Sequence, residues 1–186
     1  MKVTLGAKNC LYPTPSTLVG ANIHGKPNYI TVAHVGIMNQ VYISLSIAKR
    51  RYTNAGILEN QTFSVNIPSV GMVEKTDYCG LVSGKDIDKA KLFETFYGKL
   101  ETAPMIKECP VNMECRLIQT IDFQERNIFI GEIVETYSDD ECLTEDVVDL
   151  SKVQPILFVM INRSYWKLGQ QFAKAWSIGK NVKSPD

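Results

Sequence analysis

Short runs in which apolar and polar residues alternate dominate this chain, and they predict a protein built mainly from β-strands. Four runs carry an apolar residue at nearly every second position: residues 41–47, 62–67, 111–122 and 128–137. A period of two is expected of half-buried strands. The polar residues 124–127 separate the last two runs, and this turn signal predicts a long β-hairpin.

Two further regions predict strands. The apolar residues 17–22 are followed by the turn sequence GKPN at residues 25–28, after which residues 29–34 resume the strand pattern. A second hairpin is therefore expected near the start of the chain. The apolar run ILFVMI at residues 156–161 predicts a short buried strand.

Helical patterns are few and short. We predict helices over residues 53–59, 71–79 and 88–96, the last because Leu92, Phe93 and Phe96 stand at helical spacing. The acidic residues 138–149 are interpreted as a solvated loop or helix face, because their spacing does not match a calcium-binding loop. Many short strands with two or three inserted helices predict a mainly β fold, a β-barrel with helical excursions.

Composition limits the class of protein. The 186 residues, 45% of them hydrophobic and 22% charged, fit one domain spanning residues 1–186. The 20 basic and 20 acidic residues cancel, which argues against a general nucleic-acid binder but permits a local basic pocket. No apolar run approaches the ~20 residues of a membrane span, and the first ten residues lack a secretory signal. We therefore expect a cytoplasmic protein without membrane partners.

Cysteine and histidine residues give no metal-binding pattern. The five cysteines have no zinc-binding spacing, and they are interpreted as reduced, mostly buried thiols. Cys79 is the one thiol for which a place beside a redox group is kept open. His24 and His34 stand on different predicted elements, so no metal site is expected.

The start of the first predicted helix has the character of an anion site. Lys49, Arg50 and Arg51 stand just before Thr53, with one residue between, and we predict Thr53 to be the N-cap residue. Free amide groups at a helix N-terminus and nearby cations bind phosphate well. A phosphate-bearing ligand is the functional hypothesis, and a solvated basic corner is the alternative that the residues alone allow.

Six short motifs follow one another along the chain. They are PNYITVA at residues 27–33, SLS and RYT within 44–53, FSVN at 63–66, CGLVSGKDIDK at 79–89, APMI with EC within 103–115, and IGEI at 130–133. In order and spacing they resemble motifs of the flavin reductase-like family, and more narrowly of its flavoredoxin branch. The resemblance extends from about Leu5 to about Leu168.

This resemblance implies an FMN-binding split barrel of Greek-key type. The cofactor-binding residues that it implies, together with the residues argued above, are Asn28, Ile30, Thr31, Ala33, His34, Ser44, Leu45, Ser46, Arg51, Tyr52, Thr53, Asn66 and Lys85. Arg51, with Thr53 and the helix N-terminus, is expected to hold the phosphate, and Lys85 is a second candidate cation.

The other members of this set are expected at the ring and ribityl chain. The backbone of residues 44–46 can meet the polar ring edge, although an edge strand with exposed serines fits equally well. Asn28 and Thr31 are expected at the ribityl chain or the ring, while Asn28 is also a common turn residue. His34 can tune the flavin potential or be a half-buried structural histidine.

The resemblance leaves several roles open. Tyr165 and Trp166 are interpreted as core aromatic residues, with a place over the flavin or at a dimer seam as the alternative. Flavoredoxins often carry Trp where His34 stands, and His where Arg126 or Asn127 stands, so redox tuning and partner choice do not carry over with the fold.

Three functions compete. The first is a homodimeric flavin-dependent oxidoreductase that uses NAD(P)H; since no GxGxxG or P-loop motif occurs, NAD(P)H must enter the flavin pocket itself. The second is an electron carrier that exchanges electrons with a redox protein such as a ferredoxin. The third is a non-catalytic barrel that binds haem or another flavin.

Overall fold

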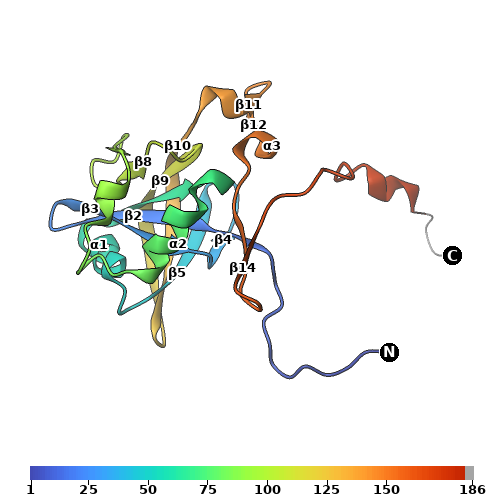
Figure 1. Ribbon diagram of the computed structural model, residues 1–186, viewed down its shortest axis with the longest axis horizontal. Helices are drawn as coiled ribbons and strands as arrows, with labels where there is room; N and C mark the ends of the chain where they lie inside the picture. Colours follow the sequence, from blue (N-terminus) through green and yellow to red (C-terminus); the bar gives the residue numbers. More distant parts are fainter. Residues whose placement is uncertain (183–186) are drawn as a thin grey trace.

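A seven-stranded antiparallel sheet forms the body of the protein in the computed structural model, which describes residues 1–182 (Figure 1). Its strand order is β3-β2-β6-β9-β10-β5-β4. The strands are β2 (Thr17–Ile23), β3 (Lys26–Val32), β4 (Val35–Ile37), β5 (Tyr42–Ala48), β6 (Thr62–Ile67), β9 (Val111–Phe123) and β10 (Arg126–Ser138). The sheet curls into a half-barrel, so the split-barrel expectation is confirmed.

The strongest sequence patterns predicted the long strands well. Strands β5, β6, β9 and β10 lie where alternation placed them, β2 lies where the apolar residues 17–22 predicted it, and β9 and β10 form the long predicted hairpin. The first hairpin turn is shorter than predicted, because β3 already begins at Lys26 and pairs it with Ile23. The edge strand β4 was not predicted, since its three residues are too few to show a period.

Small sheets decorate the body. A three-stranded sheet joins β1 (Thr14–Pro15), β13 (Leu157–Val159) and β14 (Ser164–Trp166). Two short pairs join β7 (Thr95–Phe96) with β8 (Met105–Ile106), and β11 (Leu143–Thr144) with β12 (Val147–Val148). The strand expected over residues 156–161 exists as β13, but it is only half-buried because its sheet lies outside the barrel core.

Two helices of nine residues pack on the sheet: α1 (Tyr52–Asn60) and α2 (Val73–Leu81). Shorter helical turns are η1 (Val70–Met72), η2 (Lys89–Leu92), η3 (Asp140–Cys142), α3 (Leu150–Val153) and η4 (Ile178–Asn181). The helix predicted over residues 88–96 is wrong. It is reduced to η2, because Thr95 and Phe96 pair with β8 instead.

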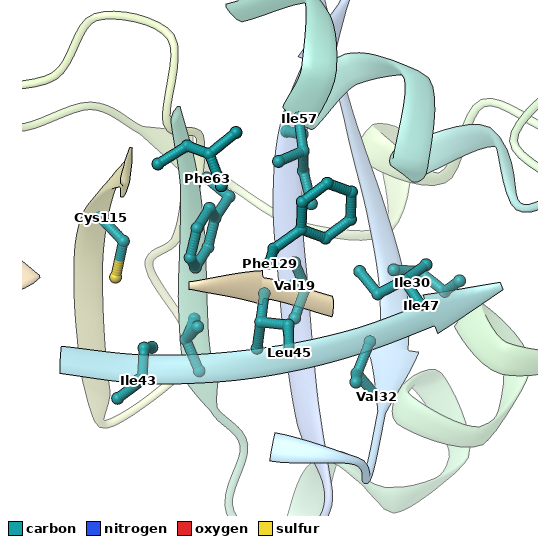
Figure 2. Close-up of a cluster of buried hydrophobic side chains, with 13 residues drawn as sticks. Val19, Ile30, Val32, Ile43, Leu45, Ile47, Ile57, Phe63, Cys115 and Phe129 are labelled. Carbon is teal, nitrogen blue, oxygen red and sulfur yellow. The ribbon is translucent and has the colours of Figure 1, made fainter. Parts of the chain in front are cut away.

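The core lies between the concave face of the sheet and α1 (Figure 2). Phe63, Phe129 and Leu45 are fully buried there, and Ile57 reaches them from α1. Helix α1 approaches β2 closely because residue 56 is glycine: a Cβ atom there would lie 2.4 Å from the carbonyl oxygen of Asn22. A second apolar cluster, which includes Cys79, lies under α2.

Both chain ends leave the body as extended arms. Residues 1–12 and 167–182 run out on the same side in Figure 1, and nearly all of their residues are exposed. Within residues 1–182, no helix is long and apolar enough to cross a bilayer.

Candidate functional site

A pocket of about 550 Å³ opens between the sheet, α2 and the β13–β14 hairpin. Its floor is formed by the end of β3 and the residues after it, from Ile30 to His34, and by the end of β5 at Ser46. Helix α2 contributes Asp77 and Gly80, and the hairpin contributes Tyr165. Segments far apart in the sequence therefore build one hollow.

Positive charge is concentrated at this pocket. Arg50, Arg51, Arg126 and Arg163 line it, and Asp77 is the single acidic residue among its lining residues in the described part of the chain. The protein as a whole is neutral, so the pocket is a local cationic region. Such a region attracts anionic ligands and anionic partner surfaces.

The predicted anion site at the start of α1 faces this pocket. Arg51 is the N-cap residue of α1 and has extended backbone, and no side chain caps the helix. The first amide groups of α1 are therefore without an intrahelical or side-chain acceptor. Arg51 also donates a hydrogen bond of 3.3 Å to the Gly80 carbonyl at the end of α2. Lys49, in contrast, pairs with Asp122 at 2.7 Å and does not line the pocket.

Thr53 is not the N-cap residue, and this prediction is wrong by two positions. Its side chain is buried in the first turn of α1 and accepts a hydrogen bond of 2.6 Å from the Asn28 amide. Asn28 is itself buried on β3. The pair fixes the start of α1 against the sheet, which positions Arg51.

Lys89 is a cation that the sequence reasoning missed. Only 3% of its surface is exposed, and its ammonium group donates to the carbonyl oxygens of Cys79 at 3.1 Å and Val82 at 3.4 Å. Burial lowers the pKa of Lys89, and the nearby charge of Arg51 lowers it further. The predicted cation Lys85 is exposed. The DK pair at the end of the CGLVSGKDIDK motif could have pointed to Lys89.

Arg126 fixes the opposite wall of the pocket. Its guanidinium group donates to the hydroxyl of Ser46 at 2.7 Å and to the carbonyl oxygen of the same residue. His34 lies beside it with its side chain exposed, and partial desolvation together with the Arg126 charge lowers the pKa of His34. His34 is therefore a neutral imidazole at pH 7, able to donate and accept hydrogen bonds.

The β13–β14 hairpin forms the outer wall. The Tyr165 hydroxyl donates to the Asp77 carboxylate at 2.6 Å, and burial followed by this carboxylate raises the pKa of Tyr165. The ring of Phe158 packs 5.7 Å from that of Tyr165. The interpretation of Tyr165 and Trp166 as core residues is wrong: Tyr165 lines the pocket, and Trp166 is 57% exposed.

The pocket brings together six of the predicted cofactor-binding residues: Ile30, Thr31, Ala33, His34, Ser46 and Arg51. Asn28, Tyr52 and Lys85 line a neighbouring hollow of about 340 Å³ together with Lys89. The two hollows lie on either side of the start of α1, since Arg51 borders one and Tyr52 the other.

Four predicted residues line neither hollow. Thr53 and Leu45 are buried, and Ser44 is half-buried with its hydroxyl 3.5 Å from the Gly36 carbonyl. Asn66 is fully buried; its amide donates to the Leu18 carbonyl at 2.8 Å. Direct contact of these side chains with a cofactor is not supported by their positions.

Ser16 was also missed. It lines the pocket, and its buried hydroxyl has no hydrogen-bond partner within the described residues. A buried polar group without a partner is unfavourable, and Ser16 is only 2% exposed. In residues 1–182, no cluster of three histidine, cysteine or acidic side chains could hold a metal ion.

The fold and pocket are those of a split-barrel flavin protein. Residues 9–167 match the family model described as flavin reductase like domain, and the chain belongs to this family. Flavoredoxin from Methanosarcina acetivorans is 44% identical, with a TM-score of 0.94 over 97% of this chain and 98% of that chain. Flavoredoxin of Desulfovibrio vulgaris (Miyazaki F) is 36% identical, with a TM-score of 0.90 over 96% and 100%.

Other relatives agree on the family or the fold. An uncharacterized protein of Archaeoglobus fulgidus is 30% identical over 135 residues, which are 70% of this chain and 75% of the relative. An FMN-binding protein from Thermus thermophilus shares 19% identity and a TM-score of 0.78 over 94% of this chain and 97% of that chain, and shows the fold alone. The family relation supports a flavin cofactor and flavin-dependent electron transfer.

The residues present fit such a group. A flavin mononucleotide needs a phosphate site, polar partners for its chain and ring edge, and a flat slot. Uncapped amide groups beside Arg51 provide the phosphate site. The exposed His34 side chain and the Arg126 guanidinium group provide polar partners at the pocket wall. The ring of Tyr165 and the residues from Ile30 to His34 bound a slot between them.

Proposed function

We propose that this protein binds FMN in the arginine-lined pocket and transfers electrons through it. The observation that carries the proposal is the position of Arg51, which stands at the uncapped N-terminus of α1 and lines the pocket. A bound flavin supplies hydride and one-electron chemistry. The chain's own residues bind it, orient it and set its surroundings.

The phosphate is assigned to the start of α1. Arg51 supplies a charged donor, and the amide groups of residues 52 and 53 supply backbone donors. Lys89 lies close enough to Arg51 for the two charges to affect each other, so it adds to the positive potential. Asn28 and Thr53 hold the helix start in place through their 2.6 Å hydrogen bond.

The ring is assigned to the slot between β3 and the β13–β14 hairpin. His34 stands at one edge as a neutral imidazole, and Arg126 is held beside it by Ser46. Both can interact with a ring that gains negative charge on reduction. Tyr165 and Phe158 form the outer face, which keeps bulk water from that side.

The exchange partner is expected to be anionic. If one phosphate binds at Arg51, the positive charges of Arg50, Arg126 and Arg163 remain at the pocket. Asp77 is the single acidic residue among the described lining residues. Either an acidic redox protein, such as a ferredoxin, or the diphosphate of NAD(P)H fits this charge. We favour the electron carrier, because the two relatives of 44% and 36% identity are flavoredoxins. A homodimer in the cytoplasm completes the proposal.

Absorption and extraction test the cofactor. Purified or FMN-reconstituted protein is expected to be yellow, with a flavin band near ~450 nm, and the extracted cofactor should have the mass of FMN. A colourless protein that FMN cannot reconstitute would contradict the proposal and favour a non-catalytic barrel. Release of FAD would overturn the choice of FMN.

Anaerobic stopped-flow measurements separate the two roles. An electron carrier should be bleached slowly by NADH and NADPH, and rapidly by a reduced ferredoxin. Rapid bleaching by either nucleotide would instead make the protein an NAD(P)H-dependent oxidoreductase. The arginine cluster is consistent with that second function, so both nucleotides must be tested.

A further inference from the structure

The C-terminal arm exposes large apolar side chains to an unusual degree. Phe172 is 99% exposed and Trp176 is 96% exposed. In the described part of the chain, side-chain hydrogen bonds of residues 170–182 stay within the arm, as in the 3.3 Å bond from Gln171 to the Ala173 carbonyl. An exposed aromatic segment of this kind indicates an interaction surface.

The two arms start from the sheet that forms the pocket wall. Residues 1–12 lead into β1, and residues 167–182 continue directly from β14. The β13–β14 hairpin supplies Phe158, Arg163 and Tyr165 to the pocket. Whatever holds the arms therefore also holds this wall.

The course of the arms is shared with a solved structure. Flavoredoxin from Methanosarcina acetivorans superposes on 97% of this chain with a TM-score of 0.94. The body without the two arms makes up clearly less than 97% of the chain. The superposed part therefore includes most of both arms. The first arm residues, 167–171, border a hollow beside α3, whereas Phe172 and Trp176 further along are almost fully exposed. An ordered course for this outer part needs another partner.

A matching surface lies on the same side of the body as the arms (Figure 1). Strand β4 is one of the two edge strands of the seven-stranded sheet. On it and just after it, Ile37, Met38 and Val41 are 89%, 54% and 46% exposed. Open edges are usually covered. A two-fold dimer joins the same face of both subunits, so that face must be complementary to itself. A face with both an apolar arm and an apolar strand edge meets this requirement, because each arm can pack on the edge of the other subunit.

We propose that two copies of this chain clasp each other with their C-terminal arms, and that Phe172 and Trp176 of each arm pack on the β4 edge of the other copy. This deepens the homodimer of the proposed function and does not depend on which cofactor is bound. Buried aromatic anchors commonly dominate an interface of this kind. The clasp also braces the β13–β14 hairpin, which supplies one wall of the pocket.

The first test measures mass in solution with cofactor-free, full-length protein. Sedimentation equilibrium should show a dimer, and Phe172→Ser with Trp176→Ser should raise its dissociation constant at least tenfold. Because both side chains are solvent-exposed within one subunit, far-UV circular dichroism should be unchanged. Gln171→Ser with Lys174→Ser is the matched control on the same arm and should remain dimeric.

The receiving surface is tested by Ile37→Ser with Met38→Ser, which should weaken the dimer in the same way. A monomeric wild-type protein, or a dimer that neither pair of substitutions weakens, would overturn the proposal. Co-sedimentation of a monomeric wild-type protein with vesicles of anionic phospholipid would assign the arm to a membrane surface and would also overturn it.

Tryptophan fluorescence gives an independent readout. Trp166→Phe leaves Trp176 as the sole tryptophan, since the chain contains two. Dilution through the dimer dissociation range should shift its emission to longer wavelength as the indole becomes exposed to water. Emission that stays that of an exposed indole at every protein concentration would contradict the clasp. Because no flavin is present, failure here leaves the FMN proposal untouched.

Discussion

The hydroxyl of Tyr165 on β14 donates a 2.6 Å hydrogen bond to the carboxylate of Asp77 on α2, and the bond closes one side of the arginine-lined pocket. It joins the outlying three-stranded sheet to a helix that packs on the barrel. The two residues are 88 positions apart in the sequence.

Tyr165→Phe removes this bond and should lower the free energy of unfolding by roughly 1–2 kcal/mol. A hydrogen bond to a charged group is worth about 1.5–3 kcal/mol, and partial exposure reduces this. Urea denaturation measures the change. Tyr78→Phe, at a more exposed tyrosine on α2 next to Asp77, should be nearly neutral. Equal stabilities for the two variants would show that the bond does not brace the hairpin.

Arg51→Ala should weaken FMN by at least tenfold and riboflavin much less, because the guanidinium group is expected to contact only the phosphate. Isothermal titration with both flavins measures the difference. Lys85→Ala is the matched control, since Lys85 is exposed and does not line the arginine pocket. Equal losses for FMN and riboflavin would remove Arg51 from the phosphate site.

His34 should titrate below the ordinary histidine pKa of about 6.5, because partial desolvation and Arg126 lower its pKa. At a pH between the pKa of His34 in the folded protein and its ordinary pKa of about 6.5, the unfolded chain binds more protons than the folded protein. The folded protein is therefore favoured fully above about pH 6.5, and this stability is lost as the pH falls from there toward the lower, folded-state pKa. NMR titration measures it, with His24→Gln assigning the signal. Arg126→Gln should raise the pKa, and a value unaffected by Arg126→Gln would contradict the assigned cause.

Gly56→Ala should destabilise the protein by about 1–3 kcal/mol, the range for overpacking, although alanine is the better helix former. The new Cβ would lie 2.4 Å from the Asn22 carbonyl oxygen and 2.6 Å from a side-chain carbon of Ile23. Thermal and urea denaturation check this. Leu58→Ala, at an exposed site on the same helix, should change stability by less than ~0.5 kcal/mol.

Arg163→Glu should slow reduction of the bound flavin by an anionic donor and speed reduction by a cationic one such as reduced methyl viologen. Positive charge at the pocket mouth speeds the association of anionic donors and slows that of cationic ones. Stopped-flow rates at several salt concentrations measure it, and the salt dependence with the anionic donor should become weaker. Lys91→Glu, outside the pocket, is the control. Rates independent of the charge at position 163 would place electron exchange elsewhere.

Local sequence patterns predicted most of the barrel. Alternation in the sequence marked the long β9–β10 hairpin. Burial alternates only along the first half of β10, whereas β9 is mostly buried up to Leu117 and exposed from Ile118 to Phe123. The segment 88–96 was misassigned because the spacing of Phe93 and Phe96 also suits a turn followed by a short strand. Strand β4 and the β1–β13–β14 sheet depend on pairing between distant segments, which local periodicity does not report.

The site was predicted in part for the same reason. Arg51 and the residues from Ile30 to His34 stand beside recognisable strand and helix boundaries, and the structure brings them together. Lys89, Arg126 and Tyr165 reach this region only through tertiary packing. A buried lysine held by two carbonyl oxygens looks, in sequence, like any solvated lysine.

The cysteine that adjoins the pocket in the sequence does not take part in the chemistry of the pocket. Cys79 directly precedes the pocket residue Gly80, yet its side chain is fully buried in the cluster under α2. Burial raises the pKa of this thiol to about 11, so it is protonated and unreactive at neutral pH. The Cys79 thiol is therefore kept out of electron exchange in the pocket, and alkylating agents that modify the exposed Cys10 should leave Cys79 unmodified.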